Sequence, residues 1–433
     1  MKVAAGWSLT FYFPTVQLSM HLLFLTPQLP FPPTQGASLR NWGWLRELSA
    51  RHEVHLFTLV APGQETALAA VEGLLASVNA VPMPNRRLAR RVAQLVTTAT
   101  PDLALRLWSD RAGAALEAQL AATPFDVVQV EGLELLPYAA PFLGRPGPAW
   151  VYDAHNAEAA LQASAWRADL RRPRRWPAAG YSLIQWLKLG RYEAAMLPRF
   201  NGLVAVSEVD ADILASRCGT RPLVLPNGVD TTMLTPDGVA PHPALSNHPA
   251  LVFTGKMDFR PNVDAALWFA DEILPRVRVE VPTACFWIVG QQPHASLARL
   301  RGQPGIEITG AVERIEPYLA GAAVVVAPLR MGSGTRLKVL QALSMARPVV
   351  GTSLGCAGLG LRDGVHVRLA DSAGQFARAI VDILAAPDVA AAMGWSGRAV
   401  VVARFDWGVL APALATFYAE IVARRETVAR ADA

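Results

Sequence analysis

Residues 330–350, RMGSGTRLKVLQALSMARPVV, indicate the fold of this chain most clearly. The run 324–328 before them is short, apolar and of strand type. A glycine-rich turn follows, and side chains then recur at helical spacing, namely Leu337, Leu340, Leu343 and Ser344. This order predicts a strand, a turn and a helix that begins near Ser333 or Thr335.

The predicted turn has the features of an anion site. The free N–H groups and positive dipole end at the start of a helix favour a phosphate, and Arg336 and Lys338 add positive charge. A capped turn with two solvated cations fits the same residues. The turn lacks the Gly-Lys-Ser/Thr of a P-loop and the third glycine of a dinucleotide fingerprint, which argues against ATP hydrolysis and NAD chemistry.

Length and composition bound the class of protein. The chain has 433 residues, of which 52% are hydrophobic and 17% charged, so we expect two or three well-packed domains and no disordered tract. The net charge of +5 comes mostly from arginine. The cysteines show no CxxC or Cys/His spacing: Cys218, Cys285 and Cys356. We therefore expect neither disulfides nor a zinc site, and a reducing cytoplasm.

The amino terminus faintly resembles a signal peptide, with one lysine and a short apolar stretch in residues 1–13. No small-residue cleavage site follows, and Pro14, Gln17 and His21 interrupt the run, so we discount that reading. We expect the native start at Met20, which leaves residues 1–19 outside the fold. No later apolar run reaches the roughly 20 residues that span a bilayer.

Short apolar runs alternate with stretches long enough for helices. The first set of expected strands comprises 22–25, 54–60, 127–130, 149–152 and 203–206, and the second comprises 251–253, 285–289, 306–308, 324–326 and 349–351. This alternation predicts two α/β domains with doubly wound parallel sheets. The segment 233–249 has linker composition. Ligands of such sheets bind beyond the carboxyl ends of the strands, so we expect the chemistry in a cleft between the domains.

Six segments together resemble the retaining glycosyltransferases of family 4, from about His21 to Tyr418. They are LPFPPTQGASLRNWGWLRELSARHEVHLFTL, DAHNAEA, RYEAAMLPRFNGLVAVSEVDADIL, VLPNGVD, FTGKMDFRPNVDAALWFADEILP and GSGTRLKVLQALSMARPVV. The last segment resembles a branch with a Gly-Ser-Gly-Thr-Arg-Leu-Lys turn. The resemblance implies the GT-B fold, with two Rossmann-like domains facing a cleft. Residues 20–232 would form the acceptor domain, 233–405 the donor domain, and a final helix, 406–425, would cross back to the first domain.

The resemblance also implies site residues in the first domain. Gly36 would let the backbone approach the donor diphosphate closely, and Arg40 in the same segment would lie on the acceptor side. His155, after a buried strand, would hydrogen-bond the donor sugar or support charge at the anomeric carbon. Glu131 would contact the acceptor. The alternatives are a proline-rich turn at Gly36, a packed histidine and a solvated carboxylate.

In the second domain the resemblance places a cation against the donor diphosphate just after Gly255, and Lys256 is our candidate. A second family lysine falls on Asn262, which carries no charge. We expect Arg336 and Lys338 to compensate, because cations on a leaving diphosphate stabilise charge without a metal. We take Asp210 and Asp212 as structural, because they follow a predicted helix cap at Ser207. We see no Asp-x-Asp pair of the kind that holds manganese, so we expect no metal and no cofactor.

The paired glutamates of the family fall on Ser333 and Gln341 in this chain, and neither is acidic. Gln341 keeps an acceptor oxygen for the nucleotide ribose but loses the charge. We expect donor contacts from the turn and the following helix, namely Ser333, Gly334, Thr335, Lys338 and Gln341. No carboxylate nucleophile emerges from these loops, so the resemblance implies front-face transfer, with His155, Lys256 and Arg336 as the catalytic residues.

The acceptor is expected to be a glycan or a lipid-linked molecule, as in polysaccharide and cell-envelope synthesis. A basic, tryptophan-rich region suits anionic lipid headgroups: Trp166, Arg167, Arg171, Arg172, Arg174, Arg175, Trp176, Trp186, Lys188 and Arg191. A solvated helix face with inward tryptophans is the alternative. We expect a cytoplasmic protein, at the inner face of the plasma membrane if lipids bind, and no nucleic acid.

Three functions fit the sequence. A sugar transferase with a nucleotide-sugar donor is the main expectation. A nucleotide-sugar epimerase would need catalytic acids and bases that the motifs do not supply. A non-catalytic GT-B subunit is favoured by Gln341 and Asn262, which replace charged residues of the family.

Overall fold

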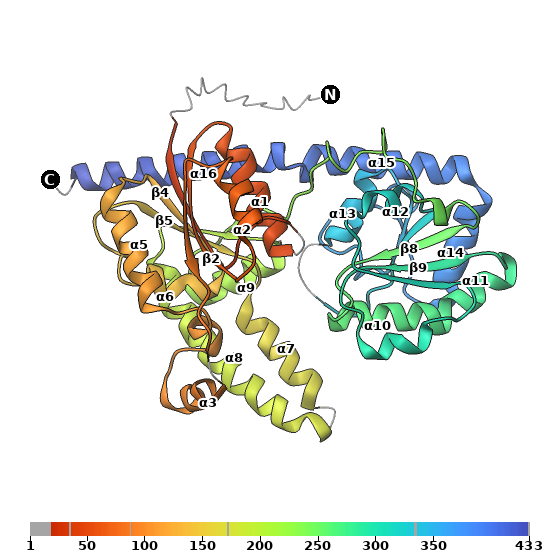
Figure 1. Cartoon of the computed structure of the whole chain (residues 1–433), viewed down its shortest axis with the longest axis horizontal. Helices are drawn as coiled ribbons and strands as arrows, with labels where there is room; N and C mark the ends of the chain where they lie inside the picture. Colours follow the sequence, from red (N-terminus) through yellow and green to blue (C-terminus); the bar gives the residue numbers. More distant parts are fainter. Residues whose placement is uncertain (1–18, 34–35, 87, 171–172, 333–335, 432–433) are drawn as a thin grey trace, which may run out of the picture.

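The computed structural model describes residues 19–431 except 34–35, 87, 171–172 and 333–335. These residues form two α/β domains that lie side by side (Figure 1), each built on a parallel sheet with helices on both faces. The turn residues Ser333, Gly334 and Thr335 lie outside the described residues. The predicted fold class, two doubly wound parallel-sheet domains, is confirmed.

The sheet of the first domain has seven parallel strands in the order β3-β2-β1-β4-β5-β6-β7. The strands are β1 (His21–Thr26), β2 (Glu53–Val60), β3 (Ser77–Pro82), β4 (Val127–Glu131), β5 (Ala149–Ala154), β6 (Gly202–Ala205) and β7 (Leu223–Val224). All five strands predicted from apolar runs are confirmed. β3 and β7 were not predicted, because they lie at or near the sheet edges and their side chains are mostly only partly buried.

The second sheet has six parallel strands in the order β10-β9-β8-β11-β12-β13. The strands are β8 (Ala250–Thr254), β9 (Cys285–Val289), β10 (Ile306–Gly310), β11 (Val324–Ala327), β12 (Val349–Gly351) and β13 (Arg368–Leu369). The five predicted strands are confirmed, and the two-residue edge strand β13 was not predicted.

Helices cover both faces of each sheet (Figure 1). The first domain contains α1 (Gly36–Ser49), α2 (Glu65–Glu72), α3 (Leu88–Thr97), α4 (Asp102–Leu105), α5 (Asp110–Ala122), α6 (Leu136–Ala139), α7 (Glu158–Leu170), α8 (Trp176–Met196) and α9 (Glu208–Cys218). The second contains α10 (Arg260–Trp268), α11 (Leu274–Glu280), α12 (Glu316–Ala320), α13 (Leu337–Ser344), α14 (Ala373–Ala385) and α15 (Pro387–Phe405), and α16 (Trp407–Ala431) follows.

Helix α13 begins at Leu337, later than the start near Ser333 or Thr335 that the spacing predicts, so that expectation was wrong. The residue before it, Arg336, has φ −82° and ψ 63°, which is not helical. The amphipathic side of α13 packs into the core through Val339, Leu340 and Leu343. Periodicity reports this buried face but not the backbone angles of the preceding turn, which is why the predicted start was too early.

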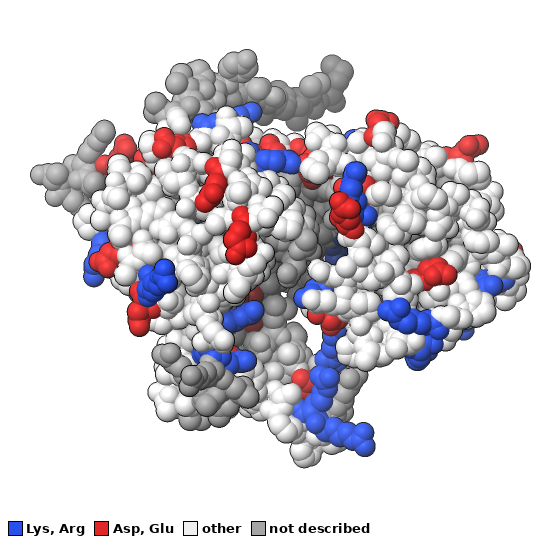
Figure 2. Space-filling model, in the orientation of Figure 1, with Lys and Arg blue, Asp and Glu red and all other residues white. Residues whose placement is uncertain are grey.

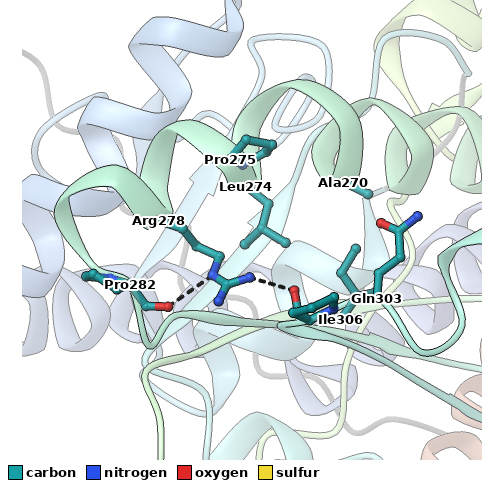
Figure 3. A pocket seen from close by; sticks show the side chains of 8 residues that line it. Ala270, Leu274, Pro275, Arg278, Pro282, Gln303 and Ile306 are labelled. Carbon is teal, nitrogen blue, oxygen red and sulfur yellow. Dashed lines mark hydrogen bonds between the residues drawn. The ribbon is translucent and has the colours of Figure 1, made fainter.

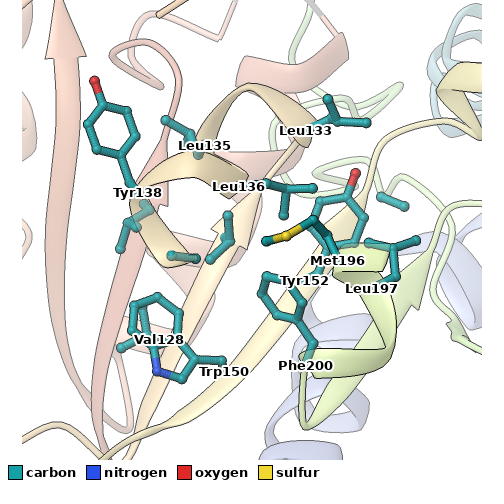
Figure 4. Close-up of a cluster of buried hydrophobic side chains, with 14 of the residues drawn as sticks. Val128, Leu133, Leu135, Leu136, Tyr138, Trp150, Tyr152, Met196, Leu197 and Phe200 are labelled. Atoms are coloured by element: carbon teal, nitrogen blue, oxygen red, sulfur yellow. The ribbon is translucent and has the colours of Figure 1, made fainter. Parts of the chain in front are cut away.

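One face of the first sheet packs against α6 and the end of α8 (Figure 4). Tyr152 of β5 packs against Phe200 with ring centroids 5.7 Å apart, and Trp150 and Val128 lie in the same cluster as Leu136. These side chains alternate along their strands because successive residues of a strand face opposite sides of the sheet. The resulting core packs against β4 and β5, and both strands end at the candidate site.

Helix α16 runs from the second domain across the first (Figure 1). Its Trp407, Leu414 and Tyr418 share a buried cluster with Leu22 and Phe24 of β1. The close approach depends on small residues of the first domain, because a Cβ at Gly43 of α1 would overlap the Trp407 ring. The last helix therefore ties the two domains together through apolar packing.

We expect Gly43→Ala to destabilise the protein by about 1–3 kcal/mol, because the added methyl group overpacks the contact between α1 and Trp407. Urea unfolding measures the change. Gly180→Ala in α8 is the matched control, since its Cβ meets nothing within 4 Å among the described atoms. There alanine is expected to be neutral or stabilising, by about 0.5–1 kcal/mol. Equal effects at both glycines would contradict the packing argument.

Candidate active site

Polar side chains of the first domain gather where β4 and β5 end. Glu131 is the last residue of β4 and pairs in register with Asp153 of β5. His155 follows β5, and its Nε2 lies 2.7 Å from Glu131 Oε2. The His155 side chain is 17% exposed, whereas Glu131 is fully buried. The predicted residues Glu131 and His155 therefore form one unit, in which the histidine is the part that reaches solvent.

The electrostatics of this pair favour a histidine that carries a proton. Burial and the charge of Asp153 raise the pKa of Glu131. Burial lowers the pKa of His155, but the hydrogen bond and negative charge of Glu131 outweigh it, and the net pKa is raised. Because the two groups share a hydrogen bond, they titrate together. The arrangement can present a hydrogen-bond donor to a sugar hydroxyl or to a developing negative charge.

A network of buried hydrogen bonds inside the first domain holds Glu131 in place. Gln129 Nε2 donates to Glu131 Oε1 at 2.5 Å, and Tyr418 of α16 donates its hydroxyl proton to Gln129. An amide rotation of Asn41 on α1 allows a further donation to Glu131 Oε2 at 2.9 Å. Sequence reasoning missed Gln129 and Tyr418, because the hydrogen bond joins residues almost 290 positions apart.

Arg40, expected on the acceptor side, is only 1% exposed in its side chain. Its Nε and Nη2 donate to the two carboxylate oxygens of Asp153 at 2.8 and 2.9 Å. Its Nη1 donates to the carbonyls of Leu225 and Pro226 and to Asn227 Oδ1. This geometry gives Arg40 an internal role, since it ties α1 to β5 and to the start of the interdomain connection.

Glu158, which sequence reasoning missed, opens α7 three residues after His155. Burial raises its pKa to about 7, although Asn156 Nδ2 donates to it at 3.1 Å. A carboxyl group that titrates near neutral pH can accept or release a proton during a reaction. Its place within DAHNAEA, the segment that carries the histidine, was the available signal.

Residues expected on the donor side lie at the end of β8. Gly255 follows this strand with φ 147°, a backbone conformation that favours glycine. A Cβ there would lie 2.8 Å from Asn262 Nδ2 and 3.3 Å from Lys338 Nζ. Glycine therefore leaves room for both side chains directly above the carboxyl end of the sheet, where ligands of such folds bind.

Lys338 Nζ donates to Asn262 Oδ1 at 2.7 Å and lies 4.0 Å from the centroid of the Phe253 ring. Burial and then the charge of Arg336 lower the pKa of Lys338 to about 7. Asn262 falls where the resemblance expects a lysine. A cation is present there all the same, because Asn262 holds the ammonium group of Lys338 from α13. The partner of Lys338 in this hydrogen bond is an uncharged amide, which suits a lysine that is only partly protonated at neutral pH.

Other expected donor-side residues surround this group. The Lys256 side chain is 38% exposed and lies 3.4 Å from Asp258. Arg336 is buried and donates from Nε and Nη2 to the carbonyls of Leu354 and Gly332, both at 3.0 Å. Gln341 is half-buried one turn after Lys338 on α13. Lys256 is thus the more accessible cation, while the Arg336 side chain is held by two backbone carbonyls.

The starts of two helices meet across the domains. A Cβ at Gly36, the first residue of α1, would lie 3.8 Å from Leu337 Cδ1, the first residue of α13. Figure 2 shows a furrow between the two domains. The positive ends of α1 and α13 therefore come close together, with Lys338 on α13 beside them, and such helix ends favour an anion.

A separate pocket lies on the second domain between α11 and the segment before β10 (Figure 3). Arg278 crosses it and donates to the carbonyls of Pro282 and Pro304 at 3.0 and 2.6 Å. Its other lining residues are Ala270, Leu274, Pro275, Gln303 and Ile306. These are apolar or uncharged, and none of the predicted site residues lines the pocket.

Comparison with known proteins agrees with this architecture. Residues 35–233 match the family model described as Glycosyltransferase Family 4, and residues 248–386 match Glycosyl transferases group 1. A curated relative from Klebsiella pneumoniae, an uncharacterized 44.6 kDa protein in the cps region, is 24% identical over 140 residues. That alignment covers 30% of this chain and 36% of the relative.

Solved structures share the fold at low identity. HepE of Anabaena, in complex with UDP and glucose, has a TM-score of 0.64 at 14% identity, covering 92% of this chain and 99% of that one. Sucrose-phosphate synthase of Thermosynechococcus elongatus has a TM-score of 0.66 at 16% identity, covering 94% and 100%. The two facing parallel-sheet domains are thus those of the GT-B fold. With both family models matched in chain order, the protein belongs to the GT-B glycosyltransferases.

Within the described residues, the helices include none whose length and apolar content would allow it to cross a bilayer.

Proposed function

We propose that this protein is a retaining, hexosyl-type transferase that moves a sugar from a nucleotide-diphosphate sugar to a glycan or lipid-linked acceptor. The observation that supports the proposal is that the starts of α1 and α13 lie close together and that Lys338 lies beside Gly255. A diphosphate is the anion that suits two positive helix ends and two lysines. HepE of Anabaena, of the same fold, has been solved with UDP and with UDP-glucose, which supports a nucleotide-sugar donor.

In the proposed reaction the diphosphate leaves toward the start of α13, and Lys256 and Lys338 stabilise its negative charge. His155, held by Glu131, hydrogen-bonds the sugar as positive charge develops at the anomeric carbon. The leaving oxygen helps to deprotonate the acceptor hydroxyl on the same face, which retains the anomeric configuration. Side-chain cations supply the charge stabilisation in this scheme, so we propose that transfer needs no metal and no cofactor.

The branch with the Gly-Ser-Gly-Thr-Arg-Leu-Lys turn remains our assignment within family 4. For the donor set we keep Ser333, Gly334 and Thr335, which lie outside the described residues, together with Gln341. A sugar-nucleotide-binding subunit without catalysis is the second candidate, because Gln341 carries no charge where the family has a glutamate.

The acceptor is proposed to reach the first domain from a lipid surface. Helices α7 and α8 project from the body of that domain as a hairpin (Figure 1), and its end carries exposed Trp176 with Arg174 and Arg175. Of the other tryptophans expected here, Trp166 and Trp186 stack on one another at 5.4 Å within the hairpin. An exposed tryptophan among arginines suits the interface of an anionic membrane, which favours a position at the inner face of the plasma membrane.

A donor panel tests the proposal. The purified protein is mixed with uridine, guanosine, adenosine and thymidine diphosphate sugars, and thermal unfolding is followed. A true donor at 100 times its Kd should stabilise the protein by about 2.7 kcal/mol. Transfer from that donor to glycan and lipid-linked acceptors is then measured with and without a chelator, and the anomeric configuration is read by NMR.

We expect one selective donor, a retained configuration and no loss of transfer in the chelator. An inverted product would overturn the retaining mechanism, and chelator-sensitive transfer would overturn metal independence. Selective binding with no turnover on any acceptor would favour the non-catalytic subunit. If no nucleotide sugar raises the unfolding temperature, the proposed donor site is wrong.

A further inference from the structure

Four polar residues lie at the amino ends of strands in the first sheet, whereas the candidate active site lies at the carboxyl ends. His21 begins β1, Glu53 begins β2 and Ser77 begins β3, and His55 is the third residue of β2. His21 pairs in register with Glu53, and His55 pairs with Ser77. Because Glu53 and His55 are two positions apart on one strand, all four side chains share one face of the sheet.

Two histidine nitrogens at these strand ends are buried without a hydrogen bond. They are His21 Nδ1 and His55 Nε2, for which the described part of the chain offers no hydrogen-bond partner. His55 Nε2 lies 3.3 Å and His21 Nδ1 3.8 Å from the same oxygen, Glu53 Oε1. The His55 side chain is only 8% exposed. A buried polar atom left unpaired costs free energy, so both nitrogens point to a missing partner.

The spacing of these atoms is close enough for them to share a metal ion. One ligand atom from each of His21, Glu53 and His55 lies within 4.8 Å of the other two. Zinc bonds of 2.0–2.1 Å in a tetrahedron place neighbouring ligand atoms about 3.3 Å apart. The 3.3 Å pair already meets this value. His21 and Glu53 are 45% and 48% exposed in their side chains, so both are free to close the remaining gap.

The surroundings of His55 orient its ring for such a role. Its Nδ1 lies 2.7 Å from Ser77 Oγ, and the ring packs edge-on against Phe125 with centroids 5.1 Å apart. When Nδ1 carries the proton and donates to Ser77, Nε2 presents its lone pair to Glu53 and His21. Histidine ligands commonly donate their other ring N–H to such a partner, which fixes the tautomer.

We propose that His21, Glu53 and His55 bind a divalent transition-metal ion of the zinc class. Two imidazoles and one carboxylate are ligands that suit this ion, and the exposed side of the site leaves a fourth position for water. The site lies at the amino ends of the strands, away from Glu131 and Lys338 at the carboxyl ends. The ion therefore clamps β1 to β2 and stabilises the fold without entering sugar transfer. The cysteine spacing that argued against zinc does not bear on this histidine site.

Zinc chloride titrated into chelator-treated, full-length protein tests the site, with calorimetry for stoichiometry and thermal unfolding for stability. We expect one ion per chain and a higher unfolding temperature. His21→Ala and Glu53→Gln should each weaken binding at least tenfold, and their exposed side chains make misfolding an unlikely source of the loss. Ser77→Ala should weaken binding by about 10–100-fold, because it removes only the partner of a ligand.

His248→Ala is the matched control, since this exposed histidine lies in the second domain and should leave binding unchanged. The inference is overturned if the wild-type protein takes up no zinc, or if the His21, Glu53 and His248 variants bind it alike. Sugar transfer measured on the same samples keeps this result separate from the donor assignment, because loss of the ion should lower the unfolding temperature without abolishing transfer at a permissive temperature.

Discussion

Lys338→Met is expected to lower kcat/KM for sugar transfer by about 10²–10³-fold. This is the usual loss when an enzyme loses one preorganised group that stabilises charge in the transition state. The ammonium group lies at the end of β8, held by Asn262 Oδ1 at 2.7 Å, where the proposed leaving diphosphate gathers charge. Methionine keeps the approximate volume and the contact with Phe253 but supplies no charge. Steady-state kinetics with the donor from the panel measure the change.

The pH dependence of donor binding identifies Lys338 as the cause. Its pKa in the free protein is about 7, lowered by burial and by Arg336, and a bound diphosphate should raise it. Binding then takes up a proton, so donor affinity should fall as the pH rises above 7. In Lys338→Met this pH dependence should largely disappear.

The same pKa has a consequence for stability. The unfolded chain keeps the lysine protonated up to about pH 10.4, while the native protein releases this proton near pH 7, so the unfolded state binds more protons between these values. The Lys338 contribution therefore makes the free protein more stable as pH rises through this window, and Lys338→Met removes that slope. Arg276→Met, an exposed cation on α11, is the control for both measurements. Unchanged kinetics and an unchanged pH profile in Lys338→Met would exclude Lys338 from the donor site.

Arg40→Met is expected to lower the free energy of unfolding by about 3–5 kcal/mol, because it removes the cation that pairs with the buried carboxylate of Asp153. Urea unfolding measures this loss. Arg221→Met is the control, since Arg221 pairs with Glu208 and Asp212 on the surface, where such pairs contribute about 0–1 kcal/mol.

A double variant separates a structural role of Arg40 from a contact with the acceptor. Arg40→Met combined with Asp153→Leu removes both buried charges and should recover much of the lost stability. If Arg40 acts only inside the protein, the double variant should have the same KM for the acceptor as Asp153→Leu alone, which is the reference because the charge of Asp153 acts on the pKa of Glu131 and His155. A loss below 1 kcal/mol in Arg40→Met, or a large rise in the acceptor KM alone, would contradict the internal role.

The central strands could be predicted from the sequence because each is buried on both faces and is therefore a continuous apolar run, as in 127–130 and 285–289. The edge strands β7 and β13 escaped prediction. Each has two residues, both half-buried, and such segments leave no periodic signal. The start of α13 was placed too early, since periodicity does not report the non-helical backbone angles of Arg336.

Much of the candidate site could also be located, because polar residues directly after buried strands must lie at one edge of a parallel sheet. Together with the resemblance, this argument placed His155, Glu131 and Lys256 after buried strands, and their roles stay predictions. The resemblance put Arg40 on the acceptor side, whereas the structure binds it to Asp153 inside the protein. The resemblance also treated Asn262 as a lost cation, although its amide oxygen positions Lys338 from a segment 76 residues away.

The sequence by itself determined the class of fold, because strand and helix periodicities are local and the pattern of buried residues repeats in each domain. Only the tertiary structure decided which groups meet: Glu131 with His155, Lys338 with Asn262, and His21 with Glu53 and His55. Those pairings join separate strands and helices, and they follow from strand order and helix packing across the whole domain. A hydrogen bond or a set of metal ligands requires atoms placed to within tenths of an ångström. Residue spacing along the chain does not specify atomic positions with that precision.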